Sequence, residues 1–145
     1  CVIADVPYYD SETAALPGQI ENQMDGCEFL VHLGDIVRGE VACDDEHYIL
    51  IRDLLWESKV PAFIVPGDNE WNDCGNEIMI DAAWNRWTTY LSNFDEHWNH
   101  TIPVVRHLDR PENFYFVMKR TIVFGLIIVG GRVHDAEEWQ SRLTD

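Results

Sequence analysis

The segment IVPGDNEWNDC, residues 64–74, decides the fold of this chain. Its apolar start is typical of a buried strand, and a proline-glycine pair ends that strand directly before Asp68, Asn69 and Glu70. A strand that ends in this way delivers a carboxylate to the carboxyl edge of a sheet, where open α/β folds bind their ligands. The segment therefore predicts a strand and a candidate site at its end.

The same pattern occurs twice earlier in the chain. The run VIAD at residues 2–5 ends in Asp5, and the run FLVHLGD at residues 29–35 ends in Asp35. The second run is apolar on both faces, as expected for a parallel strand that is covered by helices. We therefore predict three strands, each followed by an aspartate.

Apolar residues at helical spacing predict a helix in each interval between these strands. The first covers residues 11–24, with Pro17 as an alternative starting point, and the second covers residues 44–59. The order strand, helix, strand, helix, strand favours the α/β class and a right-handed parallel βαβαβ unit.

The second part of the chain predicts one more buried helix and a hairpin. The helix covers residues 77–94 and has an apolar stripe that we interpret as core: Trp84, Trp87, Leu91 and Phe94. Residues 113–119 and 121–129 can pair as a hairpin, and the apolar run 122–131 is typical of a buried strand. A last helix starts at Ala136. We interpret residues 1–145 as a single, partial domain that is truncated at its C-terminus.

The charge balance limits the classes of partner. The 26 acidic and 10 basic residues give a formal net charge of −16, which disfavours nucleic acid and anionic membrane surfaces. No apolar run reaches the roughly 18 residues that span a bilayer. An anionic substrate would be repelled unless a metal ion inverted the local field. The oligomeric state cannot be predicted.

The four cysteines do not form a Cys-x-x-Cys motif, so a structural zinc site is disfavoured. Cys27 directly precedes a strand and is interpreted as a small buried hydrophobe. Cys43 and Cys74 each follow a candidate site loop, and a bridge between them is one alternative. Together with an Asn99-His100-Thr101 glycosylation sequon and the acidity, the cysteines favour an exported (periplasmic or extracellular) protein, although the compartment stays open.

If the three predicted strands lie side by side, Asp5, Asp35 and Asp68 converge at one edge of the sheet. Three carboxylates that close together need a cation in order to stay ionised. Oxygen ligands suit Mg²⁺ and Mn²⁺, whereas an added imidazole would favour zinc or iron. Two such ions bridged by a carboxylate can position a water and hold a phosphoryl group.

Taken together, these motifs resemble the calcineurin-like metallophosphoesterase superfamily, in particular a branch in which the loop reads PGDNEW. The resemblance rests on Asp5-x-Pro7, on Gly34-Asp35 with Gly39 further on, on the run from Gly67 to Glu70, and on the spacing between them. It covers nearly the whole chain. It implies a layered sandwich fold that begins with the βαβαβ unit, and hydrolysis of phosphate mono- or diesters by a metal-activated water.

The resemblance also implies roles for individual residues. Asp5 would ligate a first metal and Asp35 would bridge two metals, while Asp68 takes the place of a metal-binding Asn of the family. Asn69 takes the place of the family's catalytic His, and Glu70 would brace the loop behind the ligands. The full-length protein would hold two divalent ions, drawn from manganese, iron, zinc and magnesium.

This chain departs from the family pattern at several positions. Pro7 replaces a His ligand, and the amide of Asn69 cannot act as a general acid. The later histidine motifs of the family do not occur, and we keep only His134 as a further candidate site residue. With three assigned ligands, a dinuclear site is incomplete in these residues.

Two other functions remain open. The first is a non-catalytic metal-binding scaffold or binding domain that kept the fold, which the replacements at Pro7 and Asn69 favour. The second is a phosphoaspartate receiver, which would need a Lys after a later strand, whereas Lys119 precedes the last one. The substrate cannot be predicted beyond four candidate contacts: Tyr8, Tyr9, Trp71 and Arg132.

Overall fold

The computed structural model describes residues 1–22, 25–39, 41–128 and 135–144, which form a mixed α/β structure with one parallel and one antiparallel sheet. The parallel sheet contains β1 (Val2–Ile3), β2 (Leu30–His32) and β3 (Ala62–Ile64), in that spatial order. Helices α1 (Asp10–Asn22) and α2 (Asp45–Trp56) connect these strands. The predicted order of strand, helix, strand, helix, strand is therefore confirmed.

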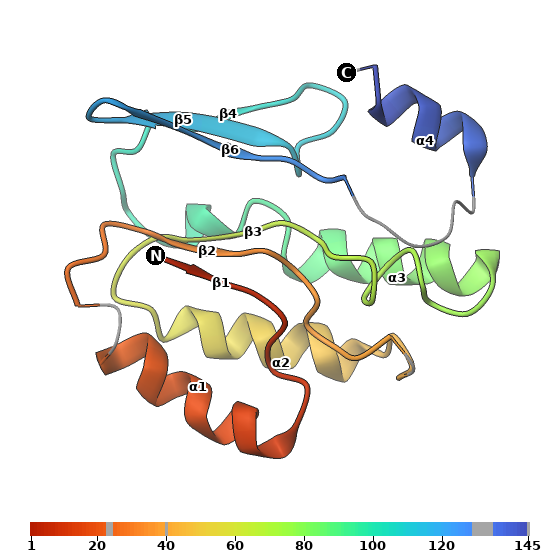
Figure 1. The fold of residues 1–145 in the computed structure, drawn as a ribbon, viewed down its shortest axis with the longest axis horizontal. Helices are drawn as coiled ribbons and strands as arrows, with labels where there is room; N and C mark the ends of the chain where they lie inside the picture. The colour runs from red at the N-terminus through yellow and green to blue at the C-terminus, as the bar shows by residue number, and fades with distance from the viewer. Residues whose placement is uncertain (23–24, 40, 129–134, 145) are drawn as a thin grey trace.

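Three layers stack on one another (Figure 1). Helices α1 and α2 cover one face of the parallel sheet, and the antiparallel sheet lies over its other face. The central contact between the two sheets is aromatic, because the Phe63 ring on β3 stacks on Phe114 and Phe116 of the second sheet, at centroid distances of 5.2 and 5.0 Å. Burial of these rings stabilises the contact between the sheets.

Helix α1 begins at Asp10, so the alternative start at Pro17 is wrong. The side chain of Glu12 explains the earlier start, because its carboxylate accepts hydrogen bonds from the backbone N–H groups of Tyr8 and Tyr9, at 2.6 and 3.1 Å. A glutamate in the first turn that reaches back in this way satisfies donors that the helix itself leaves unpaired. Leu16 and Ile20 are the residues of α1 that reach the core.

The antiparallel sheet contains β4 (Val105–Arg106), β5 (Phe114–Met118) and β6 (Thr121–Gly125). The predicted hairpin is confirmed: β5 pairs with β6, and Lys119 in the turn has a φ of 56°. The prediction of a buried strand over 122–131 is wrong for the described part of that run. One face of β6 is open and exposes Ile122 and Phe124, and the segment after the strand exposes Leu126 and Ile128. Both faces of this run carry apolar side chains, but the described part of the protein packs against only one of them.

The remaining elements are α3 (Glu77–Tyr90), the 3₁₀ helix η1 (Phe94–His97) and α4 (Ala136–Arg142). The apolar stripe of the helix predicted over 77–94 belongs to the core, as expected, although α3 ends at Tyr90 and Phe94 lies in η1: Trp87, Leu91 and Phe94 are buried, and Trp84 packs against them. Asn76 caps α3 by accepting a hydrogen bond from the Met79 N–H at 3.3 Å. Within the described residues, no helix is long and apolar enough to cross a membrane.

Candidate functional site

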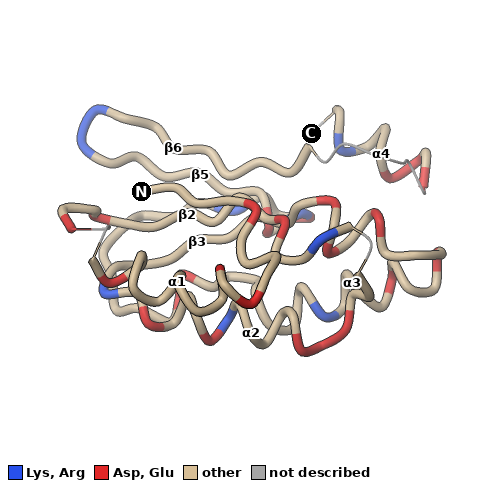
Figure 2. The backbone as a smooth tube through the Cα atoms, turned by 60° about the horizontal axis from the view of Figure 1, so that its bottom comes forward, with Lys and Arg blue, Asp and Glu red and all other residues tan. Residues whose placement is uncertain are grey.

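The three predicted aspartates follow adjacent parallel strands, because β1, β2 and β3 are neighbours in the sheet. Acidic segments meet at this end of the sheet, as Figure 2 shows. The Asp5 N–H donates to the Gly34 carbonyl at 3.2 Å, so the loop after β1 is tied directly to the loop after β2. Asp5 and Asp35 both have a φ of 57°, a left-handed conformation that aspartate tolerates better than most residues.

Two glycines allow the loops after β2 and β3 to touch through their backbones. A Cβ atom on Gly34 would lie 2.1 Å from the Gly67 nitrogen, and one on Gly67 would lie 2.0 Å from Asp35 Oδ1. Gly34 also has a φ of 85°, which disfavours any residue with a side chain. Glycine is therefore required at both positions for the Asp35 loop to reach the loop of residues 67–74, which we call the site loop.

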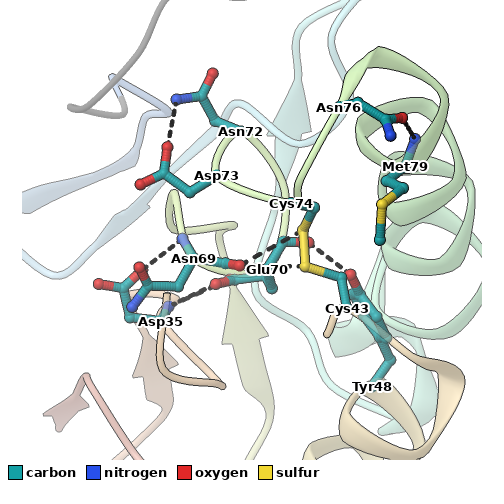
Figure 3. Close-up of a disulfide and its surroundings, with 10 residues drawn as sticks. All are labelled: Asp35, Cys43, Tyr48, Asn69, Glu70, Asn72, Asp73, Cys74, Asn76 and Met79. Atoms are coloured by element: carbon teal, nitrogen blue, oxygen red, sulfur yellow. Dashed lines mark hydrogen bonds between the residues drawn. A yellow bond between two sulfur atoms is a disulfide. The ribbon is translucent and has the colours of Figure 1, made fainter. Parts of the chain in front are cut away.

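Glu70 joins these two loops, and Figure 3 shows its contact with Asp35. It is fully buried, and its carboxylate accepts hydrogen bonds from the Gly67 N–H at 2.7 Å and from the Asp35 N–H at 3.0 and 3.2 Å. Burial raises the pKa of Glu70 to about 7, even though the N–H donors stabilise the charged form. The Tyr48 hydroxyl donates to the Glu70 carbonyl at 2.6 Å and fixes the site loop to α2. Glu70 therefore braces both loops through their backbones.

The carboxyl groups of Asp35 and Asp68 are close enough to interact directly. Partial burial raises the pKa of Asp35, and the neighbouring carboxylates of Asp68 and Asp5 raise it further, against the lowering effect of the Asn69 N–H. Like charges held this close disfavour the ionised state. The structure thus gathers negative charge at the three strand ends.

Asn69 and Tyr8 complete this cluster. The Asn69 side-chain amide donates to the Tyr8 hydroxyl at 3.1 Å, and that hydroxyl donates to Asp5 Oδ1 at 3.2 Å. Partial burial and the charges of Asp35 and Asp5 raise the pKa of Tyr8, so its hydroxyl stays protonated and available as a donor. The five side chains of Asp5, Tyr8, Asp35, Asp68 and Asn69 form one polar group, which we call the acidic cluster.

The disulfide between Cys43 and Cys74 ties the far end of the site loop to the segment before α2. Both sulfurs touch the Asn69 carbonyl oxygen, at 3.3 and 3.5 Å, as Figure 3 shows. The alternative of a bridge between these cysteines is therefore confirmed. The prediction for Cys27 is wrong, because this residue is half-buried and bridged to Cys1. Cys1 and Cys27 precede the neighbouring strands β1 and β2, so the pairing of these strands brings the two cysteines together.

His32 lies next to the acidic cluster but points away from it. The imidazole is fully buried, its Nδ1 accepts from the Gly34 N–H at 3.1 Å, and its Nε2 lies 2.9 Å from the Val6 carbonyl. These contacts assign the proton to Nε2. Burial lowers the pKa of His32 from 6.5 to about 4, so the ring is neutral near pH 7. His32 is a link between two loops and not a cluster residue.

Other sequence predictions fall outside the cluster. His134 and Arg132 lie outside the described residues. Trp71 is only 5% exposed and packs on Trp84, so the prediction that it contacts a substrate is wrong. The Trp71 indole instead packs against Trp84 on α3 and so supports the site loop.

The acidic cluster offers the types of ligand that a hard cation prefers. Its donors are carboxylate, amide and phenol oxygens, which suit Mg²⁺ and Mn²⁺. Among the residues that the structure describes, no three His, Cys, Asp or Glu side chains stand close enough together to hold a metal ion. The donor chemistry therefore fits a hard cation, whereas the three carboxylates lie further apart than the ligands of one ion would.

No known family model, curated protein or solved structure matches this chain. The resemblance to metallophosphoesterases therefore stays a prediction from motif residues and their spacing. We therefore infer the function of the acidic cluster from its own geometry.

Proposed function

We propose that this chain carries a metal-dependent site for the hydrolysis of phosphate mono- or diesters, of the calcineurin-like type. One observation carries the proposal: an aspartate follows each of three neighbouring parallel strands, and their loops are tied together by the Asp5 N–H, which donates to the Gly34 carbonyl at 3.2 Å, and by the Asn69 N–H, which donates to Asp35 Oδ1 at 3.3 Å. Such a concentration of charge is costly without a cation and is resolved by one.

Each residue of the acidic cluster has a separate task in this proposal. Asp35 and Asp68 hold the cation, and Asp5 supplies the third carboxylate. When bound, a divalent ion supplies Lewis acidity, offsets the charge of the phosphate and lowers the pKa of a water. The Asn69 amide has a second N–H besides the one that donates to Tyr8 and can donate it to a phosphate oxygen, whereas the single O–H of Tyr8 is donated to Asp5. A second ion would need ligands beyond these three aspartates.

One cationic side chain, that of Arg38, comes from the same loop as Asp35 and is compatible with a phosphate ester. The guanidinium of Arg38 lies 5.1 Å from the centre of the Tyr9 ring, and the neighbouring residue Tyr8 belongs to the cluster. Arg38 follows Asp35 by three residues, so its positive charge belongs to the same loop and offsets part of the net charge of −16.

A non-catalytic metal-binding domain is the second candidate, and the position of His32 favours it. Within the described part of the chain, the one histidine adjacent to the cluster is bound to backbone groups and is not free to transfer a proton. Proton transfer to a leaving group would then depend on solvent. Metal binding without turnover of any phosphate ester would support this candidate.

The two disulfides are typical of an oxidising compartment, and from them we propose an exported protein. Thiol labelling of the protein from its native source tests this. Blocked cysteines are expected, and four reactive thiols would contradict export.

Hydrolysis of aryl phosphate mono- and diesters in Mn²⁺, Mg²⁺ or Zn²⁺ tests the main proposal. The substitution Asp35→Asn should reduce kcat/KM by a factor of about 100 or more, because a carboxylate ligand and its charge are lost. Asp25→Asn is the matched control, since Asp25 precedes β2 and lies at the opposite end of that strand. Equal activity of the two variants, or no activity of the wild type with any of these ions, would contradict a phosphoesterase.

A further inference from the structure

A cluster of rings and charges outside the acidic cluster connects α4 to the site loop. Arg142, in the last turn of α4, has a side chain that is only 7% exposed. Its guanidinium lies 4.8 Å from the centre of the Trp71 ring and 5.5 Å from that of Trp84. The indole of Trp71 in turn lies 4.7 Å from that of Trp84 on α3. Arg142 therefore covers a pair of neighbouring tryptophans, of which Trp71 belongs to the site loop and Trp84 to α3.

Two carboxylates hold the guanidinium in this position. Arg142 Nη1 donates to Glu112 at 2.9 Å, and Nε donates to Glu138 at 2.7 Å. The side chain of Glu112 is only 4% exposed, so without Arg142 it would be a buried charge that has lost its ion-pair partner. Arg110 also donates to Glu138, at 2.6 Å, and ties the same helix to the β4–β5 connection.

Helix α4 depends on these contacts for its position. It has seven residues, none of them fully buried, and Trp139 is its partly buried apolar contact with the core. A helix this short is not stable by itself in water. Arg142 is therefore a principal anchor of α4 and also a cover for Trp71.

The contact at Trp71 is transmitted to the acidic cluster through the backbone. Trp71 directly follows Glu70, which braces the loop of Asp35, and the Trp71 N–H donates to the Asp68 carbonyl at 3.2 Å. The Asp73 N–H donates to the same carbonyl at 2.9 Å, and the Cys74 N–H to the Trp71 carbonyl at 3.1 Å. A shift of the Trp71 indole would therefore move the backbone that presents Asp68 and Asn69.

We propose that Arg142 is a positioning residue: by docking α4 on Trp71 it holds the site loop in the conformation that presents Asp68 and Asn69. A guanidinium stacked on an indole and held by two carboxylates is stiff, and lysine cannot reproduce its planar geometry. The consequence for catalysis rests on the proposed phosphoesterase function, whereas the consequence for the loop does not.

Hydrogen exchange of single backbone amides in the full chain tests the structural part. Arg142→Met keeps most of the side-chain length but removes the charge. It should speed exchange at Trp71, Asp73 and Cys74 by a factor of about ten or more, while Val31 and Val65 in the parallel sheet stay within about twofold. Arg52→Met is the matched control, because Arg52 also pairs with a carboxylate and stacks on a ring, but does so on α2, away from the site loop. Arg52→Met should leave the exchange rates of the site-loop amides unchanged.

Uniform acceleration in both regions, or no acceleration in the site loop, would overturn the proposal. If Arg142→Met does not fold, Arg142→Lys decides, since it keeps a charge for Glu112 but loses the planar stack. It should still speed exchange selectively in the site loop, and unchanged exchange there would overturn the proposal.

Kinetics with an aryl phosphate ester supply a second readout. Arg142→Met should lower kcat by about tenfold with KM within about twofold, because the residue does not touch the substrate. A change in KM alone would contradict positioning. An inactive wild type would count against the phosphoesterase function only, because hydrogen exchange decides the role of Arg142 without any turnover.

Discussion

At the scale of single residues, the candidate site depends on positions where a larger or differently shaped side chain does not fit. Gly34 and Gly67 bring two loops into backbone contact, and Glu70 satisfies the donors that this contact exposes. Asp5 and Asp35 adopt left-handed backbone conformations. Unusual backbone geometry and a buried carboxylate in one place are features that concentrate at functional sites in proteins.

The substitution Gly34→Ala should lower the free energy of unfolding by about 3 kcal/mol or more, since the new Cβ would collide with the Gly67 backbone at a positive φ. Gly18→Ala is the control. Nothing lies within 4 Å of a Cβ there, and this position in α1 should gain about 0.5–1 kcal/mol. Urea denaturation measures both. A tolerated Gly34→Ala would show that the two loops are not in contact.

His32 should make stability fall at acid pH. Its pKa is about 4 in the folded protein against 6.5 in the unfolded chain, so between these values the unfolded chain binds the extra proton. The stability that the neutral ring contributes is present above pH 6.5 and is lost as the pH falls toward 4, by about 3 kcal/mol.

Urea denaturation of the wild type and of His32→Gln at pH 7, 5.5 and 4.5 measures this effect. The difference between the two proteins isolates His32, because Glu70, whose raised pKa acts in the opposite direction, is present in both. The wild type should lose its advantage as the pH falls. A difference that does not vary with pH would show that His32 is not buried as a neutral ring.

At the scale of elements, the two disulfides hold different parts of the parallel sheet. Cys1–Cys27 joins the segments before β1 and β2, and Cys43–Cys74 joins the segment before α2 to the site loop. The two disulfides close loops of similar length, with sequence separations of 26 and 31. Chain entropy therefore predicts similar stabilisation, whereas the effect on the acidic cluster should differ.

Replacing Cys43 and Cys74 with alanine should cost about 3 kcal/mol of stability and should also weaken binding of Mn²⁺ by the acidic cluster. The matched variant, with alanine at Cys1 and Cys27, should lose a similar amount of stability but keep its affinity for the ion. Chemical denaturation and calorimetric titration measure these quantities. Equal losses of affinity in the two variants would show that the Cys43–Cys74 bridge has no special relation to the site loop.

The order of strands and helices along the chain and the elements that carry the aspartates could be predicted from the sequence, because short apolar runs that end in an aspartate are local signals. The exposure of Ile122 and Phe124 could not, because alternation shows that two faces exist and not which face is covered. The bridge at Cys27 and the contact of Arg142 with Trp71 join distant parts of the chain. Both depend on tertiary packing, which local patterns do not encode.

At the scale of the whole molecule, the layered arrangement places the acidic cluster at one end of the parallel sheet. The helices support that end on one face, and the aromatic contact with the antiparallel sheet supports it on the other (Figure 1). Arg142 and the Cys43–Cys74 bridge anchor the site loop from two further directions. A rigid frame that holds the polar side chains of a site in place is what a binding site requires.

Binding of Mn²⁺ to the wild-type chain, followed by native mass spectrometry and calorimetric titration, tests the central claim most directly. We predict that the wild type and Asp25→Asn bind at least one ion and that Asp35→Asn does not. Without metal, Asp35→Asn should be at least as stable as the wild type, because it removes a charge that Asp68 and Asp5 oppose. A wild type that binds no ion, or an Asp35→Asn variant that binds it equally well, would contradict a metal site and leave the aspartates as residues of three turns.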